Sequence, residues 1–447
     1  MSFSPSSLLN HLERDLPAGA TGKLCVALSG GLDSIVLVRA LVAARGAFSL
    51  RAVHIDHQLH ADSAKWSDQC ARVASDVGVP YLSRQVTVPT DSGIGVEAAA
   101  RTVRYAALKS LLEPGEVLLT AQHADDQLET LLLALLRGAG VNGLSAMPAC
   151  QAFGDGWHLR PLLHFTRQQL EAWARAERLI WLDDPSNDDS RFSRNYLRHE
   201  VVPALRRRWP EVANSAVRTA AHLGEAGDLL AHLAKADLET AAAGAGLRVD
   251  VLSQLDAARR RNVLRYWLRS RGARAPSTQQ LAGLEHDMLQ AQDDRTPWVR
   301  WEGFEVRRHR GLLYGGAPLV EFSAPETELS WDMRSPLMLP AGLGVLRAEP
   351  VRGVGLAVEK FPEPPRVGFR RGGETLQLAG HVHRRDLKKL LQEAGVLPWW
   401  RDRVPLLRVG RRLAAVGDLW VGEQFAARGD EPGVRLVWEA RPAILAI

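Results

Sequence analysis

The stretch at residues 29–34, SGGLDS, constrains the fold of this chain most strongly, because it joins two apolar segments of different kinds. Leu24, Val26 and Leu28 precede it in a short run typical of a buried strand, and residues 35–44 follow as an apolar stretch long enough for a helix. Two adjacent glycines allow a sharp turn and bring backbone N–H groups close to a ligand. The start of the following helix adds free N–H groups and the positive end of its dipole. The pattern predicts a loop that binds a phosphate chain. Its residues are Ser29, Gly30, Gly31, Leu32, Asp33 and Ser34.

Asp33 is the unexpected residue in this loop, because a bare carboxylate would repel phosphate. The loop also lacks the lysine of the Walker motif and the third glycine of the dinucleotide-binding motif. A magnesium ion held between Asp33 and the phosphates removes the repulsion, so the sequence predicts a metal ligand here. SGGLDS resembles the pyrophosphate loop of the N-type ATP pyrophosphatases, which cleave ATP to AMP and pyrophosphate. The alternative is an ordinary glycine turn between a strand and a helix.

The composition is that of a globular chain with room for two to four domains: 447 residues, of which 46% are hydrophobic and 24% charged. The three cysteines are far apart and form no CxxC pair, which argues against a disulfide framework or a zinc site. No run approaches the roughly 20 apolar residues of a membrane span. Charged residues at positions 13–15 argue against a signal peptide. We therefore expect a cytoplasmic protein without a membrane partner.

Strand and helix patterns alternate over the first third of the chain. Strand candidates lie at residues 50–55, 81–88 and 117–121, and helix candidates at 64–77, 96–112 and 125–136. This alternation predicts an α/β fold with a parallel sheet and helices on both faces. Ligands of such sheets bind at the carboxyl ends of the strands, where the SGGLDS loop, Asp56 and the Gln122–His123 pair all fall.

The remainder of the chain reads differently. Residues 211–292 look all-helical, residues 298–320 change to short strands, and residues 321–335 resemble a linker. The last part is punctuated by glycine and proline and contains one clear helix at residues 385–394. We predict a PP-loop ATP-binding catalytic domain at residues 1–213. A mainly helical domain at 214–325 and a small α+β domain at 336–447 follow.

A cluster of acidic residues with one histidine lies where the fourth strand meets a helix, in the sequence QHADDQLET at residues 122–130. His123, Asp126 and Thr130 share one helical face. The helix dipole favours acidic residues in a first turn, which explains one carboxylate but not a histidine with Asp125, Asp126 and Glu129 together. The cluster therefore predicts a functional site.

Two groups of arginines admit two readings each. Arg101 and Arg104 share a helix face with Glu97, either as ordinary surface pairs or, beside a phosphate site, with Arg101 holding the charge that develops on a transferring phosphoryl group. Arg194 and Arg198 lie one helical turn apart after the turn sequence DDPSN at residues 183–187. They either clamp a phosphate or face solvent.

Taken together, these motifs resemble the tRNA(Ile)-lysidine synthetase family. The order and spacing agree over about residues 20–210 and again in the C-terminal part. The motifs are SGGLDS, VHIDHQLH (53–60), VEAAARTVRY (96–105), QHADDQLET, the glycine loop at 137–144, RPLL (160–163), DDPSN, RNYLR (194–198), RGGE (371–374), DLKKLL (386–391) and VLPWWRDRVPL (396–406). Three positions depart from the family pattern: Gln122 where a second histidine is frequent, Ala139 for serine and Thr375 for arginine.

The resemblance implies a carbon–nitrogen ligase that joins L-lysine to the wobble cytidine of a tRNA(Ile) with a CAU anticodon. The 2-carbonyl oxygen of the cytosine attacks the α-phosphate of ATP and expels pyrophosphate, and the lysine amine then displaces AMP. In this scheme Asp33 holds Mg²⁺, Asp56 lies near the adenine, and Arg101, His123 or Arg198 stabilises the α-phosphate. Lysine is bound or deprotonated by an acidic residue, and the sequence leaves the choice open. The candidates are Asp125, Asp126 and Glu129.

The resemblance also implies that tRNA is held outside the reaction centre, because the wobble base must leave its stack. The candidate contacts are Arg194, Arg206, Arg207, Arg208, Arg385, Lys388 and Arg401. Trp399 and Trp400 can stack on bases or fill a core. Three other functions remain possible readings of the sequence. One is a thiolase-type tRNA-modifying enzyme, which usually has cysteine pairs that are missing here, and another is an amidotransferase-type synthetase, which needs a glutaminase segment that is not present. The third is a non-catalytic tRNA-binding protein.

Overall fold

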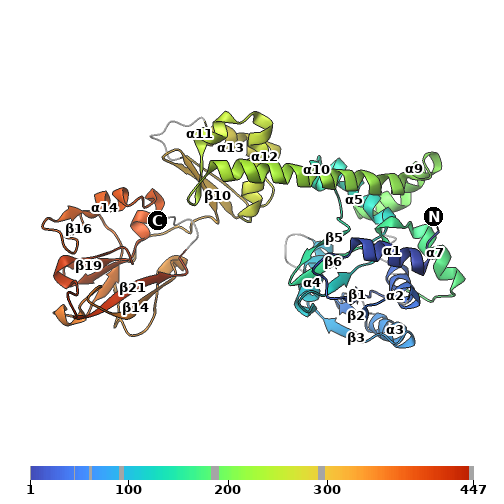
Figure 1. Ribbon diagram of the computed structural model, residues 1–447, viewed down its shortest axis with the longest axis horizontal. Coiled ribbons are helices and arrows are strands. Elements are labelled where there is room, and N and C mark those ends of the chain that lie inside the picture. Colours follow the sequence, from blue (N-terminus) through green and yellow to red (C-terminus); the bar gives the residue numbers. More distant parts are fainter. Residues whose placement is uncertain are drawn as a thin grey trace. The chain divides into compact units, whose positions relative to one another are not determined.

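The computed structural model describes residues 2–44, 46–59, 63–89, 95–182, 191–289 and 297–441 (Figure 1). The chain forms two compact units, Met1–Leu229 and Leu230–Ile447. The three domain boundaries expected from the sequence stay predictions.

A six-stranded sheet with the order β3-β2-β1-β4-β6-β5 forms the centre of the first unit. All neighbouring strands pair in parallel except β5, which is antiparallel to β6 at the edge. The expected α/β fold with a parallel sheet is confirmed. The strands are β1 (Lys23–Ala27), β2 (Ser49–Asp56), β3 (Tyr81–Gln85), β4 (Val117–Leu119), β5 (Cys150–Phe153) and β6 (Gly156–Leu159).

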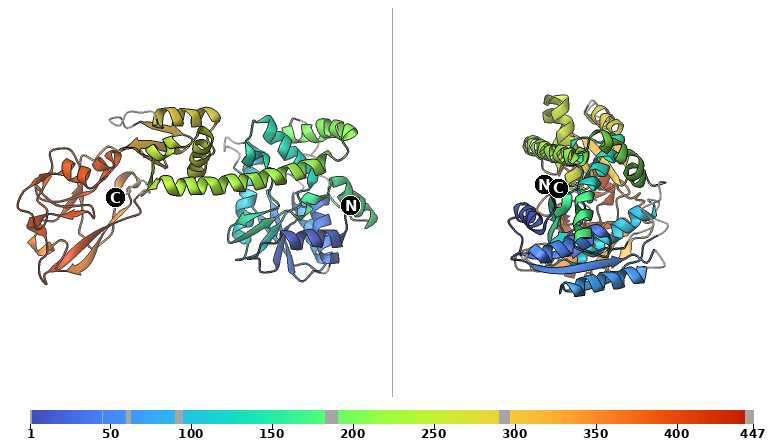
Figure 2. Two further views of the ribbon diagram at one scale, coloured as in Figure 1. Left: turned by 45° about the horizontal axis from the view of Figure 1, so that its top comes forward. Right: turned by 90° about the vertical axis from the view of Figure 1, so that its right-hand side faces the viewer.

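Helices cover both faces of this sheet (Figures 1 and 2). Side chains alternate along β1, so Leu24 and Val26 pack with α1, α2, α3 and α7, whereas Cys25 packs on the opposite face with Leu108 of α4. The helices of this unit are α1 (Pro5–Asp15), α2 (Leu32–Ala44), α3 (Ser63–Asp76), α4 (Val96–Leu111), α5 (Ala124–Leu136), α6 (Val141–Leu144), α7 (Arg167–Ala176), α8 (Ser193–Tyr196) and α9 (Val202–Arg208). A 3₁₀ turn (Pro161–His164) and a π-helical turn (Leu197–Val201) complete them.

Two hairpins were not expected from the sequence. The strands β5 and β6 turn at Gly154, which has a φ of +63°. The second hairpin, β7 (Ala242–Ala243) and β8 (Gly246–Arg248), interrupts the segment at 211–292, so the all-helical reading of that segment is wrong. The physical reason is a long-range one: β8 pairs with β11, and this pairing is invisible to local periodicity.

The second unit begins with a helical layer on an antiparallel sheet of order β7-β8-β11-β10-β9. Its core contains Trp267, Phe304 and Leu313. Besides β7 and β8, the elements are α11 (Val249–Gln254), α12 (Ala257–Ser270), α13 (Thr278–Leu289), β9 (Trp298–Trp301), β10 (Phe304–His309) and β11 (Leu312–Gly316). The long helix α10 (Val212–Ala241) precedes them.

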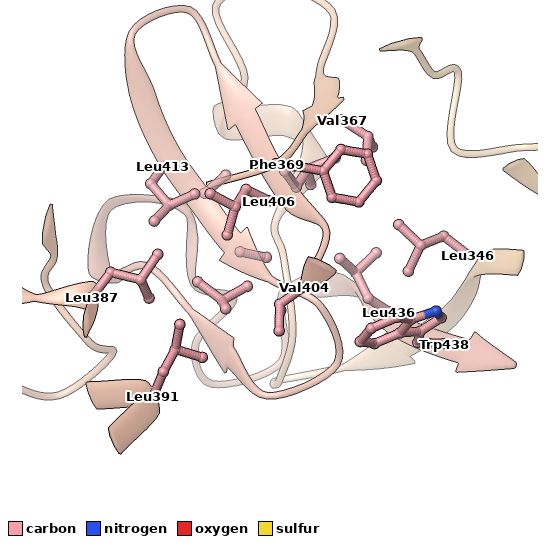
Figure 3. Packing of buried hydrophobic residues seen from close by; sticks show 14 of the residues in the cluster. Leu346, Val367, Phe369, Leu387, Leu391, Val404, Leu406, Leu413, Leu436 and Trp438 are labelled. Carbon is pink, nitrogen blue, oxygen red and sulfur yellow. The ribbon is translucent and has the colours of Figure 1, made fainter. Parts of the chain in front are cut away.

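The C-terminal part packs an antiparallel sheet of order β12-β15-β18-β19-β20 with the three strands β13-β14-β21. Figure 3 shows its core, in which Leu346, Leu436 and Trp438 lie close together. The elements are β12 (Leu329–Ser330), β13 (Leu337–Met338), β14 (Val345–Arg352), β15 (Arg366–Gly368), β16 (Thr375–Leu376), β17 (Arg385–Asp386), α14 (Leu387–Glu393), β18 (Leu406–Val409), β19 (Arg412–Val416), β20 (Trp420–Val421) and β21 (Pro432–Glu439). Short 3₁₀ turns lie at Pro340–Gly342, Val358–Lys360, Pro398–Arg403 and Glu423–Phe425.

Two expectations for this part need correction. The linker expected at 321–335 includes β12, and Trp331 beside it is buried in the core because β12 pairs with β15. Trp400 is fully buried, so it cannot stack on a nucleobase, and Trp399 is half-buried against the same core.

Candidate active site

The SGGLDS loop forms a tight turn between β1 and α2. Gly30 has a φ of +85°, which glycine adopts without strain. A Cβ at this position would lie 3.3 Å from Sγ of Cys70, so the turn is also closely packed from behind. The Ser34 hydroxyl accepts from the backbone N–H of Ser29 at 3.2 Å and donates to the carbonyl of Gly31 at 3.0 Å. These bonds fix the loop at the N-terminus of α2.

Asp33 lies in the first turn of α2 and has one oxygen in use and one free. Its Oδ2 is 3.4 Å from Nη1 of Arg167 and 3.6 Å from Nε2 of His123. Its Oδ1 is buried and has no hydrogen-bond partner among the described residues. Burial raises the pKa of this carboxyl, against the attraction of His123 and Arg167.

The free oxygen of Asp33 suits a magnesium ion. Mg²⁺ in nucleotide sites takes one or two carboxylates and otherwise phosphate and water oxygens. The described part of the chain contains no group of three or more His, Cys, Asp or Glu side chains that could hold a metal ion. The donor set fits a metal that arrives with the phosphates.

His123 caps the N-terminus of α5 and connects the loop with the acidic cluster. Its Nδ1 accepts from the backbone N–H of Asp126 at 3.4 Å, and the Asp126 carboxylate accepts from the backbone N–H of His123 at 3.1 Å. Nε2 of His123 lies 3.5 Å from Asp126 and 3.6 Å from Asp33. Burial alone would raise the pKa of Asp126, but His123, its backbone N–H and Arg198 outweigh burial and lower it.

Arginines from the segment after DDPSN neutralise the acidic cluster. Arg198 donates two hydrogen bonds to Glu129, one from Nε at 2.8 Å and one from Nη2 at 3.0 Å. Its Nη2 also donates to Asp126 at 3.2 Å. Nη2 of Arg194 donates to Thr130 at 2.7 Å. Burial raises the pKa of Glu129, although Arg198 opposes this shift. The π-helical turn starts at Leu197, and such turns often mark functional sites.

Asp125, like Asp126 and Glu129, has a hydrogen bond to each of its oxygens, but its partners come from α7 and α9. Oδ2 accepts from the backbone N–H of Arg167 at 2.8 Å, and Oδ1 accepts from the guanidinium of Arg206. Asp125 therefore ties α5 to α7 and α9.

Arg101 lies on α4, apart from the cluster at His123. Its guanidinium sits 5.0 Å above the ring of Tyr105, and its charge contributes to the lowered pKa of His158 on β6. Asp56 ends β2, where it is buried and accepts from the backbone N–H of Gln58 at 2.9 Å. The DDPSN turn at 183–187 and the side chain of Glu97 lie outside the described residues.

The residues expected to contact tRNA fall into three groups. Arg194 and Arg206 have intrachain acidic or hydroxyl partners in the site, whereas Arg207 and Arg208 are exposed at the end of α9. Three further residues belong to the second unit: Arg385 pairs with Glu393 at 2.6 Å, Lys388 is exposed on α14, and Nε of Arg401 donates to the carbonyl of Val396 at 2.9 Å.

Sequence reasoning did not single out Arg167. It follows Thr166, the N-cap of α7, in a segment whose only local signal is a capping box with Gln169. Its contact with Asp33 spans 134 positions in the sequence, so no local pattern reveals it.

Comparison with known proteins finds three family models that match this chain. Residues 6–205 match the family model of the PP-loop domain, 247–314 that of the TilS substrate binding domain and 366–438 that of the TilS substrate C-terminal domain. The tRNA(Ile)-lysidine synthase of Coxiella burnetii is 42% identical over 433 residues, which are 96% of each chain. That of Alkalilimnicola ehrlichii is 44% identical over 445 residues, 98% of this chain and 97% of the relative. The chain belongs to the tRNA(Ile)-lysidine synthase family.

Membership of the tRNA(Ile)-lysidine synthase family confirms the resemblance read from the motifs and the expectation of an ATP-using enzyme. The PP-loop match includes Ser29, Asp33, His123, Glu129 and Arg198. A solved U34-tRNA thiolase from Methanococcus maripaludis covers 49% of this chain and 78% of its own, with 17% identity and a TM-score of 0.41, too low to carry an argument. In the part of the chain that the structure describes, no helix has the length and apolar character needed to cross a membrane.

Proposed function

We propose that the protein ligates L-lysine to the 2-position of the wobble cytidine of a tRNA(Ile) with a CAU anticodon, and releases AMP and pyrophosphate from ATP. The observation that carries this proposal is the position of His123, whose Nε2 lies within 3.6 Å of both Asp33 in the phosphate loop and Asp126 in the acidic cluster. One histidine therefore joins a site for a nucleotide to a site for a cation. The names of the relatives support lysine and tRNA(Ile) as the substrates.

In the first step, the loop holds the β- and γ-phosphates by its N–H and hydroxyl groups while the cytosine oxygen attacks the α-phosphate. Mg²⁺, held by Asp33, would neutralise charge on the phosphates when bound. Negative charge grows on the α-phosphate in the transition state, so a fixed donor there lowers the barrier. His123 and Arg101 are the candidates, because Arg198 is already engaged with Glu129 and Asp126.

In the second step, the lysine ammonium must bind and then lose a proton, because an ammonium group is no nucleophile. Asp126, with its lowered pKa, stays ionised and suits binding of the cation. Glu129 has a raised pKa, and a base whose pKa lies nearer the working pH accepts a proton more readily. We propose Asp126 as the binder and Glu129 as the proton acceptor. The ε-amine then attacks C2 of the adenylated base, the C2–O bond breaks, and AMP leaves.

The tRNA has to be held while its wobble base leaves the stack. Exposed Arg207, Arg208 and Lys388 are available for backbone phosphates. Because the substrate is a tRNA, we place the reaction in the cytoplasm. The free thiols give no support to a thiolase reading: Cys25 and Cys70 are buried, and burial raises the pKa of each to about 12. Burial also raises the pKa of the half-buried Cys150 thiol.

The test is an incorporation assay with radiolabelled lysine, ATP, Mg²⁺ and tRNA(Ile) transcripts bearing CAU. We expect lysine at the wobble position and one pyrophosphate per lysine. Asp33→Ala should abolish pyrophosphate release and leave tRNA binding near normal, whereas the matched Asp68→Ala on the exposed side of α3 should behave as wild type. Absence of AMP formation by the wild-type protein would refute the proposed reaction, and unchanged turnover of Asp33→Ala would remove Asp33 from it.

A further inference from the structure

A chain of hydrogen bonds runs from β6 to the edge of the proposed active site. It starts at Arg160, whose Nη2 donates to Nδ1 of His158 at 3.1 Å. Nε2 of His158 lies 2.6 Å from the hydroxyl of Thr120, at the end of β4, and this hydroxyl bonds Oε1 of Gln122. His158 is fully buried, and Arg160 and Thr120 are nearly so. The chain ends at Gln122, the residue before His123.

The first donor fixes the direction of every bond in this chain. A guanidinium can only donate, so Nδ1 of His158 must accept and its proton must sit on Nε2. Nε2–H then donates to the Thr120 oxygen, and the Thr120 hydrogen goes to Gln122. Gln122 must therefore present its carbonyl oxygen inward. The amide of Gln151, 3.5 Å from Nδ1 of His158, agrees with this assignment because it is a second donor to the same nitrogen.

His158 keeps this assignment at physiological pH. Burial, Arg160 and Arg101 together lower its pKa to about 3, so the ring stays neutral with one donor and one acceptor.

With its oxygen committed inward, Gln122 keeps its NH₂ group free. Among the described residues, Nε2 donates no hydrogen bond, and the side chain is half-buried at the carboxyl edge of the sheet. Two groups proposed for the α-phosphate lie near this chain of bonds: His123 follows Gln122 directly, and Arg101 sits 5.0 Å above the ring of Tyr105, whose centroid is 5.7 Å from that of His158.

We propose that Gln122 is a catalytic residue whose NH₂ group, oriented through Thr120, His158 and Arg160, donates a hydrogen bond to a nonbridging oxygen of the α-phosphate. This inference rests on the proposed function. A donor whose direction is fixed before the reaction needs no reorganisation when charge develops, which is the general condition for stabilising such a transition state.

The test compares side chains at position 122 in the pyrophosphate-release step, with the intact protein, ATP, Mg²⁺ and tRNA(Ile) transcript. Gln122→Met keeps the shape and removes the donor, so kcat should fall about 10²-fold or more while KM for ATP changes little. Gln122→His should retain most of the rate, because a neutral imidazole also offers one acceptor inward and one donor outward. Gln168→Met, at an exposed position of α7, is the matched control and should equal wild type.

A second variant tests the orienting chain without changing Gln122. Thr120→Val keeps the shape and breaks the link to His158, so the amide can turn either way, and kcat should fall by less than in Gln122→Met. When Thr120→Val is combined with Gln122→Met, kcat should be little lower than in Gln122→Met alone, because Thr120 acts through Gln122.

The outcomes separate the two proposals. A wild-type protein that releases no pyrophosphate from ATP, or incorporates no lysine into the tRNA, would overturn the proposed function. An active wild type with an equally active, folded Gln122→Met would overturn the role of Gln122, as would a Gln122→His as slow as Gln122→Met.

Discussion

Replacing His158 with glutamine should make the stability of the first unit less sensitive to acid. The imidazole is fully buried, and its pKa is lowered from 6.5 to about 3 by burial and by the charges of Arg160 and Arg101. In the unfolded chain the same ring takes up a proton below about pH 6.5. Because the folded pKa is depressed, the stabilisation is complete above pH 6.5 and is lost progressively as the pH falls toward 3.

The magnitude follows from the two pKa values. At about pH 5 the unfolded state gains about 2 kcal/mol from protonation of His158, while the folded state gains almost nothing. His158→Gln retains an acceptor for Arg160 and a donor for Thr120 but cannot titrate. Between about pH 7.5 and 5 the wild-type free energy of unfolding should therefore decrease by ~2 kcal/mol more than that of the variant.

The assay is urea-dependent hydrogen exchange of the intact protein at the two pH values, read on peptides that cover β4 and β6. A local readout is needed because a chain with two compact units need not unfold in one step. Other titrating groups are common to both proteins and cancel in the difference. Equal pH dependence in wild type and variant would refute the depressed pKa, and with it the neutral ring that fixes the direction of the hydrogen-bond chain.

Three further perturbations test other parts of the site. Asp33→Asn should abolish pyrophosphate release. In urea titrations its free energy of unfolding should be unchanged or raised by about 1 kcal/mol, because burial penalises the charge of Asp33 and one of its oxygens is unpaired. Strong destabilisation would contradict this reasoning. Gly30→Ala should lower the free energy of unfolding by about 1–3 kcal/mol and weaken ATP binding measured by calorimetry. The reason is that φ at this position is +85° and a Cβ would crowd Sγ of Cys70. A wild-type affinity for ATP would contradict the tight packing of the loop. Replacing Arg207 and Arg208 with alanine should weaken tRNA binding and reduce the slope of log K against log salt by ~1–2; an unchanged slope would mean that neither contacts phosphate.

Local sequence determined the phosphate loop and much of the sheet. Adjacent glycines in SGGLDS allow the turn that Gly30 makes, and the apolar runs around it can only be buried as a strand and a helix. The strand–helix alternation predicted β2, β4, α4 and α5 close to their observed bounds, because side-chain periodicity is a property of neighbouring residues. The closeness of Asp33 and His123 also followed, since carboxyl ends of neighbouring parallel strands share one edge.

Tertiary structure decided the partners of the charged groups. Three such contacts join residues that are far apart in the sequence. Arg198 binds Glu129 across 69 positions, Arg206 binds Asp125 across 81, and Arg167 contacts Asp33 across 134. No periodicity encodes such distances. The inward oxygen of Gln122 is of the same kind, because a distant guanidinium sets its direction through a buried imidazole. Sequence alone supplies the reactive groups of this protein, and packing alone determines which of them remain free to meet a substrate.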